Sequence, residues 1–98
     1  MKFNLIMLSK DPAPPHVARP LSDLDTGQSG TIQSVTGGGA TTQRLLALGL
    51  VPGVHVRVIH LAPLGDPFTL AIDAGAQVSL RRADARHLIV ASDPEYQP

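Results

Sequence analysis

Histidine and carboxylate side chains are the main transition-metal ligands that this chain offers, because it contains no cysteine. It has four histidines and eight acidic residues. No two histidines have the close spacing of a preformed metal site, and on one regular strand His55 and His60 would lie on opposite faces. His55, His60 and His87 are therefore only weak candidate ligands. We expect no physiological metal site and no cofactor, while adventitious binding at a surface or dimer contact stays open.

A run of three glycines, Gly37 to Gly39, precedes a segment with helical spacing. Exposed amides at a helix N-terminus favour anions, so a phosphate site is one interpretation. The run lacks the Lys-Ser/Thr pair of a P-loop and the Gly-x-Gly-x-x-Gly of a dinucleotide site, and no β-α-β unit surrounds it. We interpret it as a strand-to-helix loop.

The densest charge cluster contains Arg81, Arg82, Asp84 and Arg86, which could form an anion or nucleic-acid patch. The formal net charge of the chain is zero, and only three residues are aromatic. Nucleic-acid binding needs positive potential, and single-strand binding also needs stacking platforms. We therefore interpret the cluster as a solvated turn and expect no nucleic-acid partner. No serine lies in a nucleophile-elbow context, so we expect no enzyme.

Alternating hydrophobicity along the chain indicates that the candidate residues named above are positioned by short β-strands. The clearest case is 54–60, where Val54, Val56 and Val58 share one face while Arg57 points the other way. The expected strands are 30–35, 54–60, 68–73, 77–81 and 87–91. By the same alternation, the residues expected to face the core are Val56, Val58, Leu70, Ile72, Val78 and Leu80. About five short strands favour a mainly β fold, a small barrel whose closure removes unpaired edges. Gly75 is expected at positive φ in a hairpin turn.

One segment, 41–49, has helical spacing instead. Thr41 is the expected N-cap, and Gly49 stands where a left-handed cap would end the helix. Pro52-Gly53 matches a type II turn. A helix of this length is shorter than the ~12–15 residues that hold a helix alone in water, so it must pack on the barrel.

This helix and the turn after it carry more leucines than one buried stripe can hold. We expect Leu45 and Leu48 to pack inward, and Leu46 and Leu50 to stay exposed. An exposed apolar edge of this kind is typical of a protein-binding surface.

The ends of the chain differ in composition from the middle. Residues 1–20 are expected to be a flexible, proline-rich extension, 21–91 the folded domain and 92–98 a flexible tail. The apolar run 3–8 is too short for a signal peptide, and no stretch approaches the ~20 apolar residues that span a bilayer. We expect a cytoplasmic protein that reaches a membrane only through a partner.

Three sequence blocks, 44–53, 62–67 and 80–85, resemble the FeoA family. They contain an arginine followed by leucines and a leucine-glycine-leucine cap, then a proline-glycine turn, a proline-rich loop with Gly65-Asp66, and the segment Leu80-Arg81-Arg82. The resemblance implies an SH3-like barrel, a small cytoplasmic accessory protein of ferrous-iron uptake and a partnership with the membrane GTPase permease FeoB. It implies no catalytic residue, no cofactor and no established iron ligand.

The candidate interaction residues come from the helix, its following turn and the loop at 62–67. They are Arg44, Leu46, Leu50, Pro63, Leu64 and Asp66. A related alternative is an interaction module like the C-terminal domain of iron-dependent repressors. A small-barrel nucleic-acid binder is the less favoured alternative, and a homodimer is left open.

Overall fold

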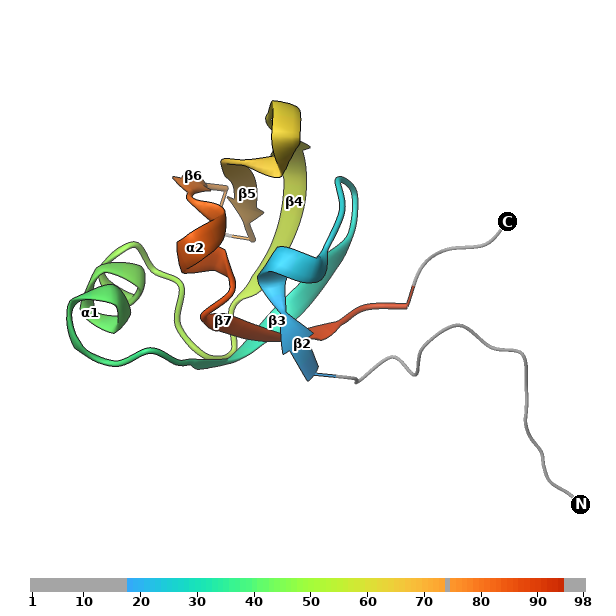
Figure 1. Ribbon diagram of the computed structural model, residues 1–98. Helices are drawn as coiled ribbons and strands as arrows, with labels where there is room; N and C mark the ends of the chain where they lie inside the picture. Colours follow the sequence, from blue (N-terminus) through green and yellow to red (C-terminus); the bar gives the residue numbers. More distant parts are fainter. Residues whose placement is uncertain (1–17, 74, 95–98) are drawn as a thin grey trace, which may run out of the picture.

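The computed structural model describes residues 18–73 and 75–94, which form a small, mainly β domain (Figure 1). The elements in chain order are β2 (Ala18–Pro20), η1 (Leu21–Asp23), β3 (Ser29–Val35), α1 (Gly39–Ala47), β4 (His55–Leu61), η2 (Pro63–Gly65), β5 (Phe68–Ile72), β6 (Gln77–Leu80), α2 (Arg82–Ala85) and β7 (Leu88–Ser92). The expected strands are confirmed as β3 to β7, with ends shifted by one residue at most. The short strand β2 falls within the segment 1–20 that we expected to be a flexible, proline-rich extension, and it pairs with β7.

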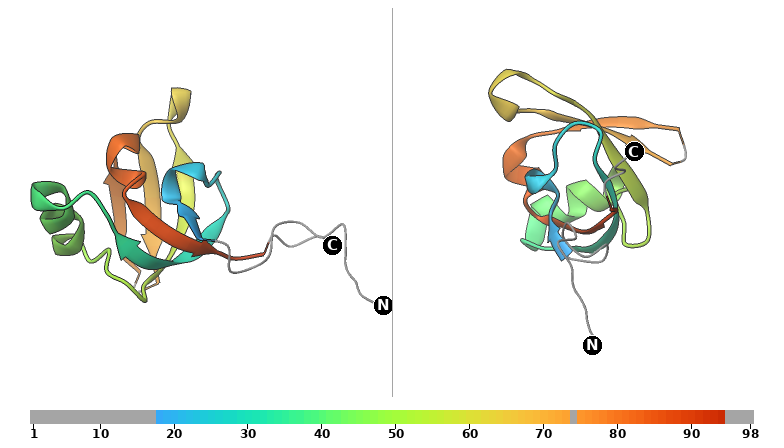
Figure 2. Two further views of the ribbon diagram at one scale, coloured as in Figure 1. Left: turned by 60° about the horizontal axis from the view of Figure 1, so that its bottom comes forward. Right: turned by 90° about the vertical axis from the view of Figure 1, so that its right-hand side faces the viewer.

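The strands form one antiparallel sheet with the order β2-β7-β3-β4-β5-β6. Figure 2 shows that this sheet curls, with α1 at one end of the molecule and the β5–β6 hairpin projecting at another. The outermost strands, β2 and β6, are not neighbours in the sheet, so the described residues form an SH3-like barrel that is not closed by a last ladder. The sheet has the shape of a barrel because it curves around the core, although its end strands do not pair with each other.

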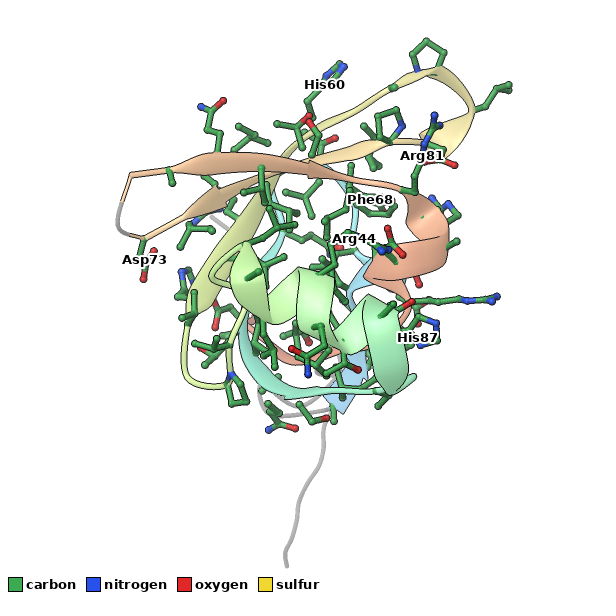
Figure 3. The ribbon with its side chains drawn as sticks, turned by 90° about the vertical axis from the view of Figure 1, so that its left-hand side faces the viewer. Arg44, His60, Phe68, Asp73, Arg81 and His87 are labelled. Atoms are coloured by element: carbon green, nitrogen blue, oxygen red, sulfur yellow. The ribbon has the colours of Figure 1, made fainter. Side chains whose placement is uncertain are left out.

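A β-bulge in β4 changes which face of the sheet His60 occupies. Arg57 pairs with Ala71 and His60 pairs with Thr69, with a register shift between Val58 and His60. Thr69 and Ala71 are two residues apart on one strand and share a face, so His60 lies on the same outer face as Arg57 (Figure 3). The expectation that His55 and His60 lie on opposite faces is wrong, because the extra residue of a bulge reverses the alternation beyond it.

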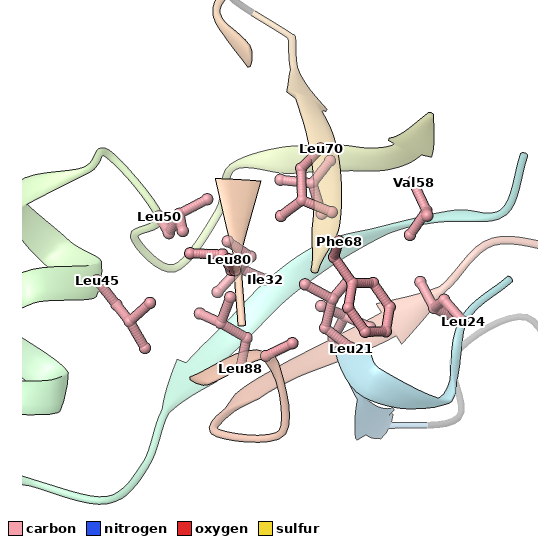
Figure 4. Close-up of a cluster of buried hydrophobic side chains, with 13 residues drawn as sticks. Leu21, Leu24, Ile32, Leu45, Leu50, Val58, Phe68, Leu70, Leu80 and Leu88 are labelled. Carbon is pink, nitrogen blue, oxygen red and sulfur yellow. The ribbon is translucent and has the colours of Figure 1, made fainter. Parts of the chain in front are cut away.

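The core lies inside the curved sheet (Figure 4). Val56, Val58 and Leu70 are fully buried and Leu80 nearly so, while Arg57 is exposed. Ile72 and Val78 are partly buried against the same cluster, which confirms the predicted register. The remaining members of the core are Leu21, Leu24, Ile32, Leu45, Leu50, Phe68, Ala85, Leu88 and Val90.

Helix α1 begins and ends differently from a simple two-turn helix. Its N-cap is Gly38, without a side-chain cap, and the Thr42 hydroxyl donates to the Thr36 carbonyl instead; the expected Thr41 cap is wrong. At the other end Gly49 has φ +91°, as predicted. The Gly49 N–H donates to the Leu46 carbonyl at 3.0 Å and the Leu50 N–H to the Leu45 carbonyl at 3.1 Å. These two bonds define a Schellman motif.

The Schellman motif reverses the chain so that Leu50 packs into the core beside α1. Leu50 and Leu45 are both 0% exposed, which matches the apolar contact that accompanies this motif. Our expectation that Leu50 stays exposed is therefore wrong, and so is the inward packing of Leu48. The type II turn is confirmed, because the Val54 N–H donates to the Val51 carbonyl at 3.1 Å and Gly53 has φ +95°.

Candidate functional site

The most distinctive exposed surface of the described residues is apolar and lies on α1 and the turn after it. Leu46, Leu48 and Val51 keep 36%, 40% and 37% of their surface exposed. We call these three residues the α1 surface. Their exposure follows from the anchoring of the segment through Leu45 and Leu50, which takes up its inward-facing positions.

The α1 helix is also tied to the rest of the domain by Arg44. Its guanidinium lies 2.7 Å from the Asp84 carboxylate on α2 (Figure 3). Because the arginine is half-exposed, this ion pair contributes little free energy of folding, on the order of 0–1 kcal/mol. Its effect is to orient α1. Arg44 is therefore already paired within the chain, and any contact with a partner would add to this bond.

The second group of candidate residues lies in the η2 loop. Leu64 is fully exposed at φ +68°, and Pro63 is exposed beside it. Asp66 is half-buried and accepts a hydrogen bond of 3.0 Å from the backbone N–H of Arg82. Asp66 thus holds the start of α2, and its role within the fold is structural.

Arg82 joins three separate parts of the chain. Its guanidinium donates to the Gly65 carbonyl at 3.2 Å and to the Ser22 carbonyl at 3.0 Å. The same group stands 4.9 Å from the centroid of the Phe68 ring, within cation–π range. The three arginines of the cluster are exposed, as expected of a solvated segment, but the segment forms helix α2 rather than a turn, and Arg82, its first residue, also makes contacts within the domain. Ala85 of the same helix is buried.

The candidate interaction residues do not form one surface. Figures 1 and 3 show the η2 loop at one end of the molecule and α1 at another, with α2 and the β5–β6 hairpin between them. The α1 surface and the η2 loop are therefore two separate regions.

His87 packs against the glycine run. A Cβ on Gly37 would lie 2.9 Å from His87 Nδ1, and Gly37 has φ +92°, so both space and backbone favour glycine there. The Thr36 hydroxyl lies 3.3 Å from the same ring nitrogen, and the Thr36 N–H donates to the His87 carbonyl at 2.7 Å. These contacts support the interpretation of the run as a strand-to-helix loop.

His55 lies between two carboxylates. Its Nδ1 is 3.0 Å from Asp73 Oδ1, and its Nε2 is 2.7 Å from Asp93 Oδ2. The Ser29 hydroxyl donates to the same Asp93 oxygen at 2.7 Å. The hydrogen bond with Asp93 is the main cause that raises the pKa of His55, and the same bond lowers the pKa of Asp93. We call Asp73, His55, Asp93 and Ser29 the His55 bridge.

Sequence reasoning missed the His55 bridge. Asp73 and Asp93 are 18 and 38 residues from His55, so no local spacing indicates that the three meet. The bridge resembles a catalytic triad only in composition, because Ser29 is almost buried and donates to a carboxylate rather than to the histidine. The two carboxylates also occupy different nitrogens of the ring and do not converge on one point. Within the described ranges, no group of three or more histidine and acidic residues could hold a metal ion.

We expect the purified protein to bind Fe(II) weakly or not at all. Both nitrogens of His55 face carboxylates of the protein, and the described residues present no converging ligand set. Anaerobic titration calorimetry is the measurement. Sub-micromolar affinity that is lost in His55→Ala or His87→Ala would contradict the prediction, with His60→Ala as the matched variant on the outer face.

The fold and the surface define the chain as a small SH3-like domain that exposes apolar side chains at the end of α1 and has no catalytic constellation among its described residues. Residues 19–92 match the family model for the FeoA domain. The chain belongs to the FeoA family, which comprises small accessory domains of iron transport and is not a known enzyme family.

Solved structures agree with this assignment. The FeoA protein from Chlorobium tepidum is 33% identical, with 74% of this chain and 69% of that chain covered and a TM-score of 0.65. A zinc complex of FeoA from Stenotrophomonas maltophilia is 27% identical, with 76% and 95% covered and a TM-score of 0.65. A manganese-dependent transcriptional repressor is 26% identical, with 83% and 38% covered and a TM-score of 0.71. A comparison with curated proteins finds no match.

The described part of the chain contains no helix that is long and apolar enough to cross a membrane.

Proposed function

We propose that this chain is a cytoplasmic accessory protein of ferrous-iron uptake that binds the cytoplasmic part of a FeoB-type GTPase permease through the α1 surface. The observation that carries the proposal is the exposure of Leu46, Leu48 and Val51 on one short, anchored element. Large apolar side chains that stay exposed on an anchored element are candidate contacts for a protein partner. The chain would reach the membrane only through this partner.

The anchoring of α1 makes it suited to binding. The Schellman motif and the Arg44–Asp84 pair hold the helix in place, so little conformational entropy is lost when a partner covers it. Fully burying one leucine contributes about 1.5–3 kcal/mol, and the α1 residues keep little more than a third of their surface to bury. Each side chain would then contribute on the order of 1 kcal/mol. This surface by itself supports a weak, reversible contact.

We expect Leu46→Asp and Leu48→Asp to abolish co-purification with the permease while leaving the thermal midpoint nearly unchanged. A carboxylate placed in an apolar interface must lose its hydration, whereas on the free protein it stays in water. Surface substitutions rarely change the free energy of unfolding by more than ~0.5 kcal/mol. The measurements are pull-down of the permease and thermal unfolding of each variant.

Leu64→Asp is the matched control, because Leu64 is fully exposed on the η2 loop, away from α1. It should bind as the unaltered protein does. Wild-type affinity and normal ferrous-iron uptake in both α1 variants would remove the α1 surface as the contact. Loss of binding in Leu64→Asp alone would move the interface to Pro63, Leu64 and Asp66. If the α1 surface joins two copies of this chain, Leu46→Asp would convert a dimer to a monomer in sedimentation.

The likeness to the manganese-dependent repressor favours a second candidate function. This chain spans 38% of that protein, so it would correspond to one module of it. The module would act by protein contact within a regulator. Direct binding to nucleic acid is disfavoured, because the net charge is zero and Phe68 is the sole aromatic residue among those described. Fluorescence-anisotropy titration with an oligonucleotide tests this alternative.

A further inference from the structure

We propose that the His55 bridge is a proton-gated latch, in which doubly protonated His55 holds both Asp73 and Asp93, and loss of one proton releases Asp73. The latch connects three places that are distant in sequence. These are strand β4, the turn after β5 and the segment that follows β7. Its release would loosen the tip of the β5–β6 hairpin.

The geometry requires two donors on one imidazole ring. Both nitrogens of His55 lie within hydrogen-bond distance of a carboxylate oxygen, at 3.0 Å and 2.7 Å. An ionised carboxylate only accepts hydrogen bonds, so each ring nitrogen must carry a proton to make its bond. The neutral ring has one N–H and one lone pair. After deprotonation, one of the two carboxylates would face a lone pair and lose its bond.

Asp73 is the carboxylate that leaves, because Asp93 is held by more bonds. The Ser29 hydroxyl donates to Asp93 Oδ2 at 2.7 Å. Backbone bonds hold both residues, because the Asp93 N–H donates to the Ser29 carbonyl at 2.9 Å and the Asp73 N–H donates to the His55 carbonyl at 3.2 Å, so the difference lies in the side chains. The Asp73 side chain has 71% of its surface exposed and makes the longer bond to the ring. Water can replace His55 as its partner at little cost.

Partial burial of the ring opposes its protonation, but the hydrogen bonds with the two carboxylates outweigh that effect and raise the pKa of His55. Strand β3 presents Ser29 and Thr31, which are neutral, and the turn after β5 presents Asp73. Arg57 is the other charged residue of β4; it donates to the Gly27 carbonyl and helps to lower the pKa of Asp93. Two carboxylates therefore face His55, and the hydrogen bond with Asp93 is the main cause of its raised pKa.

The raised pKa fixes the direction of the pH effect. A histidine whose pKa is higher in the folded state stabilises the fold fully below its unfolded value, near 6.5. That contribution is lost as the pH rises through the folded value. The latch is therefore closed at mildly acidic pH and opens as the solution becomes more alkaline. Opening of the latch would act mainly on β6, an end strand whose one neighbour among the described strands is β5 (Figure 3).

Nitrogen-15 NMR of the histidine rings tests the protonation state directly. At pH 6 both ring nitrogens of His55 should have the shifts of protonated nitrogens, and the midpoint should lie above the ordinary histidine value. Amide exchange at residues 75–77, corrected for its intrinsic pH dependence, should become several-fold faster across the same transition. A midpoint below the ordinary value, or exchange at the tip that does not follow the titration, would overturn the proposal.

Variants separate the two carboxylates. Asp93→Asn should lower the pKa of His55 more than Asp73→Asn, because the bond to Asp93 is the larger cause. His55→Gln should remove the pH dependence of exchange at the tip, whereas His60→Gln, on the same face of β4, should leave it unchanged. If His55→Gln fails to fold, Asp73→Ala, which removes the acceptor of the Nδ1 bond, still decides the matter. At pH 6 this variant should exchange the amides of residues 75–77 as fast as the unaltered protein does at high pH. If the exchange rate does not increase, the latch is refuted.

Discussion

Leu50→Asp should prevent the domain from folding, although the same change at Leu48, two residues earlier, should leave it folded. Leu50 is 0% exposed beside Leu45, whereas Leu48 keeps 40% of its surface in water. Truncating a buried leucine to alanine costs about 2–5 kcal/mol, and an unpaired buried carboxylate adds several more. The sum is comparable with the roughly 5–15 kcal/mol that stabilises a whole domain.

Circular dichroism and the one-dimensional NMR spectrum of each variant measure this difference. Leu50→Asp should lack dispersed methyl signals at about 25 °C, while Leu48→Asp and Leu46→Asp should keep them. Leu50→Met is the conservative control and should cost less than ~1.5 kcal/mol, because it keeps the apolar volume. A folded Leu50→Asp with a midpoint close to that of Leu48→Asp would mean that Leu50 is not in the core.

Gly30→Ala should destabilise the domain by about 3 kcal/mol, the upper end of the usual cost of overpacking. Gly30 lies in β3 between Val56 of β4 and Ser92 of β7. A Cβ at this position would be 2.7 Å from the Ala91 carbonyl oxygen and 3.1 Å from the Ser92 Cα. Both atoms belong to the backbone of the neighbouring strand, so no side chain can move aside. The added methyl group must push β3 and β7 apart.

Gly38→Ala is the matched control for Gly30→Ala. Gly38 has φ +59° and ψ −179°, a backbone region that is essentially restricted to glycine, and a Cβ added there would meet no atom within 4 Å. Its substitution therefore carries a backbone cost of about 1–3 kcal/mol without a steric clash. Urea denaturation of both variants gives the comparison. If Gly30→Ala were as stable as Gly38→Ala, or more stable, the steric explanation would be wrong.

The two largest expected effects on stability concern residues that also shape the proposed surface. Leu50 fixes the end of α1, and the exposed positions of Leu46, Leu48 and Val51 follow from that anchor. A substitution that unfolds the domain would also abolish binding to a partner. Binding assays on the α1 surface are therefore informative only for variants whose thermal midpoint is retained.

The local pattern of the sequence was sufficient for the strands and turns. Alternation of apolar residues predicted the register of Val56, Val58, Leu70 and Leu80, because each strand buries one face in a single core. Gly49, Gly53 and Gly75 were predicted from turn chemistry, and all three have positive φ. These features depend on residues within a few positions of one another. The family blocks at 44–53, 62–67 and 80–85 also led to the correct family, which the match over 19–92 confirms.

Only the tertiary structure decided which of these residues meet and which remain exposed. His55 finds its two carboxylates 18 and 38 residues away, and Arg82 reaches the Ser22 carbonyl across 60 residues. The bulge in β4 moves His60 to the outer face, and the Schellman motif turns Leu50 inward while Leu48 stays in water. The local alternation of apolar residues gives no information about these long-range contacts or about the bulge and the Schellman motif. They depend on how strands that are distant in sequence pair, and on how one extra residue or one left-handed glycine redirects the chain.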